Sequence, residues 1–343
     1  MDKARAACRL LAIFVAACVA VACARPAAAE DDFYKGKTIN LYIGSGPGGG
    51  YDLFGRLVAR HIGAHIPGSP IVNPQNMPGA GSVKSANFIY NAAPQDGTVL
   101  GIGTPSIALL DALHQEGVRF EAAKFNWIGR VGAEINVSFV TATTGVKTVD
   151  EARQKEVLIA CISDTSPLTL ETKVMNSTLG ARFKLIKGYA DTNATLLAVE
   201  RGEVQGTTSS WSALQTIRPD WVTNKNVNVL VQYSTRRSRL LPDIPAAVEF
   251  ARSEAEKQVV ALYSNGGDVG YAIYAGPGVP VERVKILRDA FLAMTKDKDF
   301  LDDVARLSVE FDPLSGEDLQ KIIFAATDLT PETRALAQKA VAE

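Results

Sequence analysis

The chain has 343 residues, of which 47% are hydrophobic and 21% are charged, and its formal net charge at pH 7 is −1. A charge this close to zero excludes the strongly basic surface of nucleic-acid-binding proteins, so no nucleic acid is expected as a partner. No low-complexity tract or sequence repeat stands out, and the length suits two folded domains better than a single hydrophobic core.

The first 29 residues have the pattern of a secretory signal peptide. A basic start precedes the uncharged, mostly apolar run 10–22, which is too short to span a bilayer, and residues 27–29 match a small-residue cleavage site. The pattern predicts that 1–29 is removed and that the mature chain is located in the periplasm. Because the leader carries four basic residues and one acidic residue, the mature chain has a formal charge of −4.

Three of the four cysteines lie in this leader. Cys161 alone remains after cleavage, so no intramolecular disulfide is expected. It lies in the apolar run VLIACI, which favours a small buried side chain over a nucleophile. Cys18 and Cys23 follow stretches that loosely resemble a lipoprotein processing site, and lipid attachment is the less favoured alternative to cleavage.

Beyond the leader, apolar runs alternate with segments of helical periodicity. In chain order, the expected elements are a strand at 37–44, a helix at 51–66, a strand at 69–75, a helix at 82–93, a strand at 97–103, a helix at 106–115, strands at 125–132 and 135–143, a helix at 148–154, a strand at 156–162, a helix at 167–180, a strand at 183–189, a helix at 194–202, strands at 227–235 and 270–276, and a helix at 280–296. The alternation predicts an α/β fold with mainly parallel sheets flanked by helices.

Two such units in one exported chain predict two lobes. We expect the chain to cross between them near 133–138 and again near 232–240. Lobe 1 would then comprise 30–135 plus 240–343, and lobe 2 would be an insertion comprising 136–239.

In open α/β sheets, ligands bind at the carboxyl ends of strands. Four strand-to-helix junctions carry suitable small or hydroxylic residues, at 45–52 and 104–106 in lobe 1 and at 163–166 and 189–193 in lobe 2. Such residues are most often helix caps, but four together predict one shared cleft. The candidate ligand-binding residues are Ser45, Gly46, Gly48, Gly49, Tyr51, Asp52, Thr104, Ser106, Asp164, Thr165, Ser166, Tyr189, Asp191 and Thr192.

The charges near these junctions constrain the ligand chemistry. The four loops contain no Arg or Lys, so an anionic ligand would be balanced by helix N-termini and backbone amides. Asp52 would repel a carboxylate beside it, and we expect it to accept a bond from a neighbouring backbone N–H or from a ligand's cationic or hydroxyl group. Tyr189, like Tyr51, is a candidate to cover the ligand. Lys187 and Arg130 are nearby candidates for a distal positive charge, although we interpret both as surface residues.

Motifs of enzyme chemistry are incomplete in this chain. The stretch 44–49 satisfies G-x-G-x-x-G, but the second expected strand contains no acidic residue, and an exported protein is a poor host for a nicotinamide cofactor. Ile43 stands where a hydrolase elbow needs glycine. His61 and His65 lack the glutamate of a zinc protease motif. We therefore expect no catalytic residue, no cofactor and no metal.

Ordered landmarks resemble a known family, the Bug-type periplasmic solute-binding proteins of tripartite tricarboxylate transporters. Three matches are specific: PGGGYD at 47–52, NMPGAGS at 76–82 and AAPQDGTVLGIG at 92–103. Weaker matches follow at 188–206, 234–250 and 275–284.

The resemblance implies a two-lobed Venus-flytrap receptor that captures a small organic carboxylate and delivers it to the permease subunits of a membrane transporter, without catalysis. It implies that 45–52 forms one wall of the site and 163–166 the opposing wall, where the family more often has glycines. Gln205 stands where the family usually has Asp. We expect a monomer.

Two alternative functions remain open. An exported α/β hydrolytic enzyme would use the same cleft but needs a nucleophile–base pair or a metal. A receptor of another secondary transporter type would have a similar glycine-rich opening, although the PGAG and PQDG stretches favour the tripartite tricarboxylate group.

Overall fold

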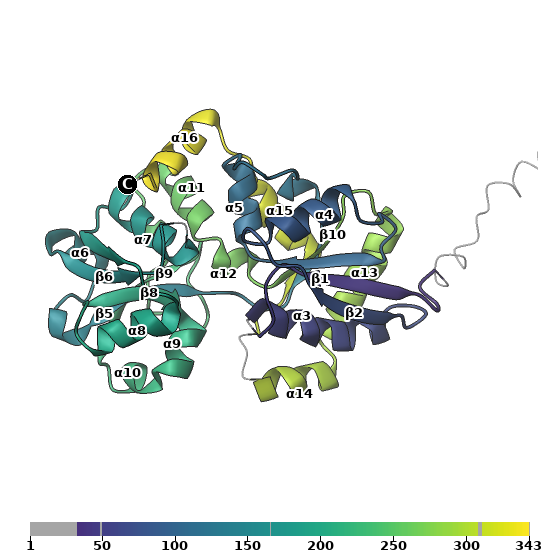
Figure 1. Ribbon diagram of the computed structural model, residues 1–343, viewed down its shortest axis with the longest axis horizontal. Helices are drawn as coiled ribbons and strands as arrows, with labels where there is room; N and C mark the ends of the chain where they lie inside the picture. Colours follow the sequence, from purple (N-terminus) through teal and green to yellow (C-terminus); the bar gives the residue numbers. More distant parts are fainter. Residues whose placement is uncertain (1–32, 49, 165, 308–310, 343) are drawn as a thin grey trace, which may run out of the picture.

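The computed structural model describes residues 33–48, 50–164, 166–307 and 311–342. Two α/β lobes lie side by side, each built on its own sheet, which confirms the predicted two-lobed fold (Figure 1). The predicted signal peptide lies outside the described residues. Among those that are described, no helix combines the length and apolar character needed to cross a membrane.

The sheet of the first lobe has the strand order β11-β4-β10-β3-β1-β2. Its strands are β1 (Thr38–Ile43), β2 (Ile71–Asn76), β3 (Val99–Gly103), β4 (Asn126–Arg130), β10 (Ala272–Ala275) and β11 (Leu314–Ser315). β1 to β4 run in one direction, and β10 and β11 run against them, so the sheet is mixed. All five residues of the central strand β3 are buried, as expected for a strand covered on both faces.

Helices cover both faces of this sheet (Figure 1). They are α3 (Gly50–His61), α4 (Val83–Asn91), α5 (Ser106–Ala112), α13 (Val281–Met294), α14 (Lys298–Leu307) and α15 (Gly316–Thr327), with short 3-10 turns η1 (Ile62–His65) and η2 (Ala122–Lys124). One hydrophobic core joins α3, α13 and α14 to the sheet, and a second joins α4, α5 and α15 to it.

The second sheet has the strand order β7-β6-β8-β5-β9. Its strands are β5 (Asn136–Thr141), β6 (Val157–Cys161), β7 (Phe183–Lys187), β8 (Gly206–Ser210) and β9 (Val227–Tyr233). Only β5 runs against the other strands of this sheet. The remaining elements are α6 (Val149–Gln154), α7 (Pro167–Ser177), α8 (Thr192–Glu200), α9 (Trp211–Ile217), α10 (Pro219–Thr223), α11 (Glu254–Tyr263), α12 (Gly266–Val269), α16 (Pro331–Ala340), η3 (Ala142–Thr144) and η4 (Ala247–Phe250).

The chain crosses from the first sheet to the second between β4 and β5, and returns between β9 and β10. Two helices from the range 240–343, which the sequence assigned to lobe 1, pack on the second lobe: α11 and α16 contact α7 and one another. Figure 1 shows both beside α7. The positions of the lobe boundaries therefore stay a prediction.

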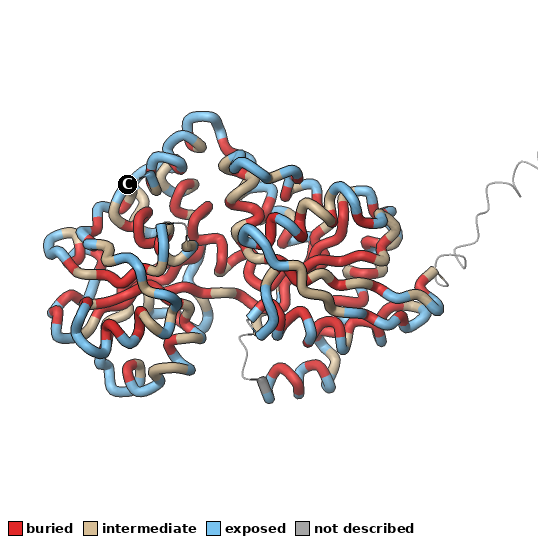
Figure 2. The backbone as a smooth tube through the Cα atoms, in the orientation of Figure 1, coloured by how far each residue is buried: buried red, intermediate tan, exposed pale blue. Residues whose placement is uncertain are grey.

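All nine expected strands are present as β1 to β7, β9 and β10, and the expected helices are present as α3 to α8 and α13. The sequence did not predict β8, because its residues GTTSS are small and polar and carry no apolar pattern. Its first four residues are nevertheless buried, and Figure 2 shows the buried backbone running through both sheets.

Candidate ligand-binding site

A cavity of about 250 Å³ lies between the lobes and is bordered by both of them. This is slightly below the range of about 300–1,000 Å³ that is typical of ligand sites, which suits a small guest. The lining residues are Tyr51, Thr104, Pro105, Ser106, Leu109, Glu134, Asn136, Ser166, Pro167, Leu168, Leu170, Glu171, Thr192, Ser210, Tyr263, Asn265 and Gly266.

Five of the candidate residues line this cavity, and they come from all four predicted junctions. They are Tyr51, Thr104, Ser106, Ser166 and Thr192. Gly49 and Thr165 lie outside the described residues. The other candidates do not line the cavity: Ser45, Gly46, Gly48, Asp52, Asp164, Tyr189 and Asp191.

Asp52 organises the loop between β1 and α3 instead of facing the cavity. Its buried carboxylate accepts hydrogen bonds from the backbone N–H of Gly48 (2.9 Å), from Arg56 Nε (3.0 Å) and from Asn76 Nδ2 (2.9 Å). The bond from Arg56 is the main reason why the pKa of Asp52 falls to about 2. These three hydrogen bonds engage both carboxylate oxygens and stabilise the loop that carries Tyr51.

Ser82 joins the carboxyl ends of β1 and β3. Its hydroxyl donates to the carbonyl of Gly44 (3.2 Å) and accepts from the backbone N–H of Thr104 (3.0 Å). A Cβ at Gly44 would lie 2.4 Å from Ser82 Oγ, so only glycine permits this approach. The contact fixes Thr104 and the start of α5 at the edge of the cavity.

The wall from the second lobe is built from helix N-termini. Ser166 is the N-cap residue of α7, Thr192 is the first residue of α8, and Ser210 caps α9 by accepting from the backbone N–H of Ala213 (3.3 Å). Helix N-termini carry partial positive charge and unpaired backbone N–H groups, both of which favour an anionic group.

The other candidates on the second lobe have structural partners. Asp191 caps α8 by accepting from the backbone N–H of Ala194 (2.9 Å). Asp164 pairs with Lys173 (3.0 Å) and with Lys187 (2.6 Å), and these two cations lower its pKa. Tyr189 packs against the hydrophobic core that includes α8.

Arg130 is not the surface residue that the sequence predicted. Its side chain is fully buried and donates from Nη1 to the carbonyls of Gly267 (2.8 Å) and Asp268 (2.7 Å). It also donates from Nε to the carbonyl of Asp312 (3.1 Å) and from Nη2 to its carboxylate (2.6 Å). The residue holds α12 against the end of β4, where the chain leaves the first lobe.

Two glutamates that the sequence did not single out line the cavity. Glu134 lies in the crossing after β4, and its Oε2 accepts from the Tyr51 hydroxyl (2.8 Å). Glu171 lies within α7 and is only 3% exposed, and its Oε1 accepts from Asn136 Nδ2 (2.9 Å). Its Oε2 has no hydrogen-bond partner among the described residues. Burial raises the pKa of both carboxyl groups.

A signal for both residues exists in the sequence. Glu134 is a lone acid in the apolar crossing VGAEINV, and Leu168, Glu171 and Met175 share one helical face at spacings of three and four. An acid at an apolar position indicates a buried and specifically partnered carboxyl group.

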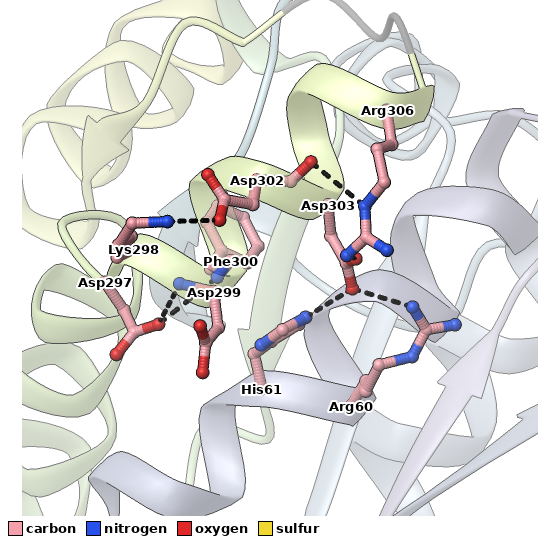
Figure 3. A network of polar contacts seen from close by, with 9 residues as sticks. All are labelled: Arg60, His61, Asp297, Lys298, Asp299, Phe300, Asp302, Asp303 and Arg306. Carbon is pink, nitrogen blue, oxygen red and sulfur yellow. Dashed lines mark hydrogen bonds and ion pairs between the residues drawn. The ribbon is translucent and has the colours of Figure 1, made fainter.

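The histidines and the remaining cysteine lie outside this cavity. His61 Nε2 and Arg60 Nη1 each lie 2.8 Å from Asp303 Oδ2, an arrangement that ties α14 to α3 (Figure 3). His65 lies 3.7 Å from Asp297.

Cys161 is buried and its pKa is raised to about 11 by burial, which confirms the interpretation as an unreactive core residue. In the part of the chain that the structure describes, no group of three or more His, Cys, Asp or Glu side chains is arranged to hold a metal ion.

No family model matches the chain. The UPF0065 protein in gbd 5'region of Cupriavidus necator is 22% identical over 318 residues, which cover 90% of this chain and 89% of that protein.

Solved structures match along nearly the same length. A TctC solute binding protein from Polaromonas has a TM-score of 0.68 at 18% identity, covering 90% of this chain and 99% of that chain. The periplasmic binding protein BugD has a TM-score of 0.58 at 17% identity, with the same coverage. MatC from Rhodopseudomonas palustris with bound malate has a TM-score of 0.56 at 16% identity, covering 89% and 99%. The chain therefore has the two-lobed fold of periplasmic solute-binding proteins such as TctC and BugD, in agreement with the resemblance predicted from its sequence landmarks.

Proposed function

We propose that the protein is a periplasmic receptor that captures a small organic carboxylate between its lobes and delivers it, as a monomer, to the permease of a tripartite tricarboxylate-type transporter. The observation that carries the proposal is the cavity bordered by both lobes, with Ser166 and Thr192 at two helix N-termini on one side and Thr104 and Ser106 on the other. Hydroxyls and helix N-termini bind a carboxylate without any lysine or arginine.

The similar structures support this assignment. Two of them contain small dicarboxylates, namely adipate in a protein of R. palustris and malate in MatC. The leader predicted at 1–29 accounts for export to the periplasm. We further propose that the lobes close by bending at the crossings near 133–138 and 232–240, because a guest held by both walls favours the closed state.

A non-enzymatic role agrees with the cavity chemistry. Of the described residues that line the cavity, none is a histidine that would activate Ser106, Ser166 or Ser210 as a nucleophile. No observation favours the hydrolytic alternative.

The test is isothermal titration calorimetry of the mature protein, unfolded and refolded to remove co-purified ligand, against a panel of mono-, di- and tricarboxylates. We expect at least one carboxylate to bind. The variant Thr192→Trp, which fills the cavity, should abolish that binding, while Asn193→Trp on the next, exposed residue of α8 should retain it. A panel without any binding would refute the proposal.

A further inference from the structure

Helix α16 contacts both lobes, and Figure 1 shows it near α7, α11 and α5. On the second lobe, the carbonyl of Ala337 accepts a hydrogen bond from the Tyr263 hydroxyl of α11 (3.0 Å). The carbonyl of Ala340 accepts one from the Ser177 hydroxyl of α7 (2.7 Å). Both alanines are buried, so the backbone of α16 is attached to the second lobe by packing as well as by hydrogen bonds.

Two side chains of the same helix reach the first lobe. Arg334 Nε donates to the carbonyl of Ala112 (2.7 Å), and Gln338 Nε2 donates to the carbonyl of Leu113 (3.2 Å). Both carbonyls lie at the carboxyl end of α5, where a helix has acceptors without partners inside the helix. Arg334 also places a positive charge at the negative end of the α5 dipole. Side chains of α16 therefore cap a helix of the other lobe.

Helix α5 packs against both lobes through different residues. Ile107 and Ala108 share a hydrophobic core with α15 of the first lobe. Leu109 and Ala112 share a core with Ala337 of α16 and with α11 on the second lobe. Leu109 also lines the cavity between the lobes. The contact of α5 with α16 therefore joins the lobes at a third place, beside the cavity, in addition to the crossings after β4 and β9.

We propose that α16 is an interlobe clasp, which holds α5 of the first lobe against the second lobe and limits how far the lobes separate. Opening that moves α5 away from α16 must break the hydrogen bonds of Arg334 and Gln338 and expose Leu109 to water. Contacts that exist in only one lobe arrangement lower the population of the others. The proposal goes beyond the proposed function, because it concerns the protein without a guest.

A clasp has to open reversibly, and the two hydrogen bonds suit that role. The bond from Gln338 is exposed and the bond from Arg334 is partly buried. Water can therefore replace both donors when the lobes separate, so that neither carbonyl of α5 is left buried without a partner.

The experiment measures the distance between the lobes by double electron–electron resonance in the mature, ligand-stripped protein. Spin labels are attached at Lys84→Cys on α4 and Gln215→Cys on α9, both exposed positions, while the buried Cys161 stays unlabelled. We expect one main distance in this labelled parent. Adding Arg334→Met and Gln338→Met should increase a longer-distance population about tenfold, the change expected for the loss of two hydrogen bonds.

Two further variants separate the clasp from general effects. Lys339→Met removes an exposed cation of the same helix that donates to neither carbonyl of α5, and it should keep the distances of the labelled parent. Gln338→Met alone removes only the exposed bond and should give a smaller increase, which keeps the test informative if the double variant does not fold. Circular dichroism melting curves establish which variants are folded.

Each other outcome contradicts the clasp. Unchanged distances in the folded variants would mean that the two crossings alone set the lobe arrangement. A shift to shorter distances would mean that α16 holds the lobes apart. An equal effect of Lys339→Met would assign the change to the charge of the helix. No carboxylate is used, so these failures leave the proposed receptor function intact, and a carboxylate panel without binding would leave the clasp intact.

Discussion

Arg130 and Glu171 both have buried ionisable side chains, but they differ in how many of their polar atoms are hydrogen-bonded. Arg130 lies at the end of β4 and donates to three carbonyls and one carboxylate. Glu171 lies beside the cavity, receives one hydrogen bond, and keeps one oxygen without a partner among the described residues. Both are almost completely inaccessible, at 0% and 3% exposure, so burial alone does not distinguish them.

The difference indicates separate roles for the two charges. Complete pairing stabilises the fold, because a buried ion keeps its hydrogen bonds only if the protein replaces those of water. Incomplete pairing instead destabilises the folded protein, because a buried acceptor loses its hydrogen bonds to water without replacement. Arg130 is therefore part of the scaffold where the lobes join, whereas Glu171 borders the cavity between them.

The largest predicted effect concerns Arg130, the buried charge whose hydrogen bonds are complete. Arg130→Met keeps an unbranched apolar side chain but removes the guanidinium group, which leaves the carbonyls of Gly267 and Asp268 without their donor. A buried acceptor without a donor costs about 1–3 kcal/mol, so we expect the free energy of unfolding to fall by roughly 2–6 kcal/mol. Urea unfolding followed by circular dichroism measures the change.

Arg201→Met is the matched control, because its side chain is 63% exposed and pairs only loosely with Glu203 at 3.8 Å. An exposed pair of this kind contributes about 0–1 kcal/mol. If both variants unfold at the same urea concentration as the unmodified protein, complete pairing of Arg130 does not stabilise the fold and the comparison is wrong.

Asp52 extends the comparison to a fully paired carboxylate. Asp52→Asn removes an acceptor from Gly48, Arg56 and Asn76, and we expect it to lower the free energy of unfolding by about 1–3 kcal/mol at pH 7. The pKa of Asp52 is lowered from 3.8 to about 2, so its stabilisation is present above pH 3.8 and is lost as the pH falls through 2. Urea midpoints measured from pH 7 downward should therefore converge for the two proteins below about pH 4.

Asp299→Asn, at an exposed position of α14, is the control for this prediction and should change the free energy of unfolding by less than about 0.5 kcal/mol. A difference between Asp52→Asn and the unmodified protein that stays constant down to pH 3 would show that the charge of Asp52 contributes nothing.

The sequence predicted the loop that carries Asp52 but not the cavity residues Glu134 and Glu171, and the reason is physical. Glycines before a helix indicate a loop because they allow backbone conformations that other residues disfavour. The loop at 44–52 can therefore be predicted from one continuous stretch of sequence. Glu134, Asn136 and Glu171 meet only through the pairing of β5 with β8 and β9, and β8 itself has no apolar pattern. Alternating strands and helices likewise predicted both sheets, whereas the packing of α11 and α16 on the second lobe depends on contacts between distant segments.

The next prediction tests whether Glu171 destabilises the empty protein. A carboxyl group whose pKa is raised on folding stabilises the fold below its unfolded pKa, and that contribution is lost as the pH rises through the folded value. Glu171 faces Glu134, Asn136 and Tyr233, and its pKa is raised, so Glu171→Gln should melt at a higher temperature than the unmodified ligand-free protein at pH 8. The two melting curves should coincide near pH 4. A variant that melts lower at every pH would assign Glu171 to the scaffold with Arg130.

The smallest predicted effect concerns the hydrogen bond between Tyr51 and Glu134 at the edge of the cavity. Tyr51→Phe removes the hydroxyl that donates to Glu134 Oε2 at 2.8 Å, while the ring keeps its contact with Tyr271 at 4.9 Å between centroids. A net contribution of about 0.5–1.5 kcal/mol per hydrogen bond corresponds to roughly two- to tenfold weaker binding of the carboxylate ligand, measured by calorimetry.

Tyr42→Phe is the control, because Tyr42 packs against Phe88 (5.0 Å between centroids) on the first lobe and does not line the cavity. The decisive measurement is the double variant Tyr51→Phe, Glu134→Gln. If Tyr51 acts by orienting the carboxylate of Glu134, removing the hydroxyl after that carboxylate has been neutralised should cost less affinity than removing it alone. Equal losses in both backgrounds would mean that Tyr51 contacts the guest directly.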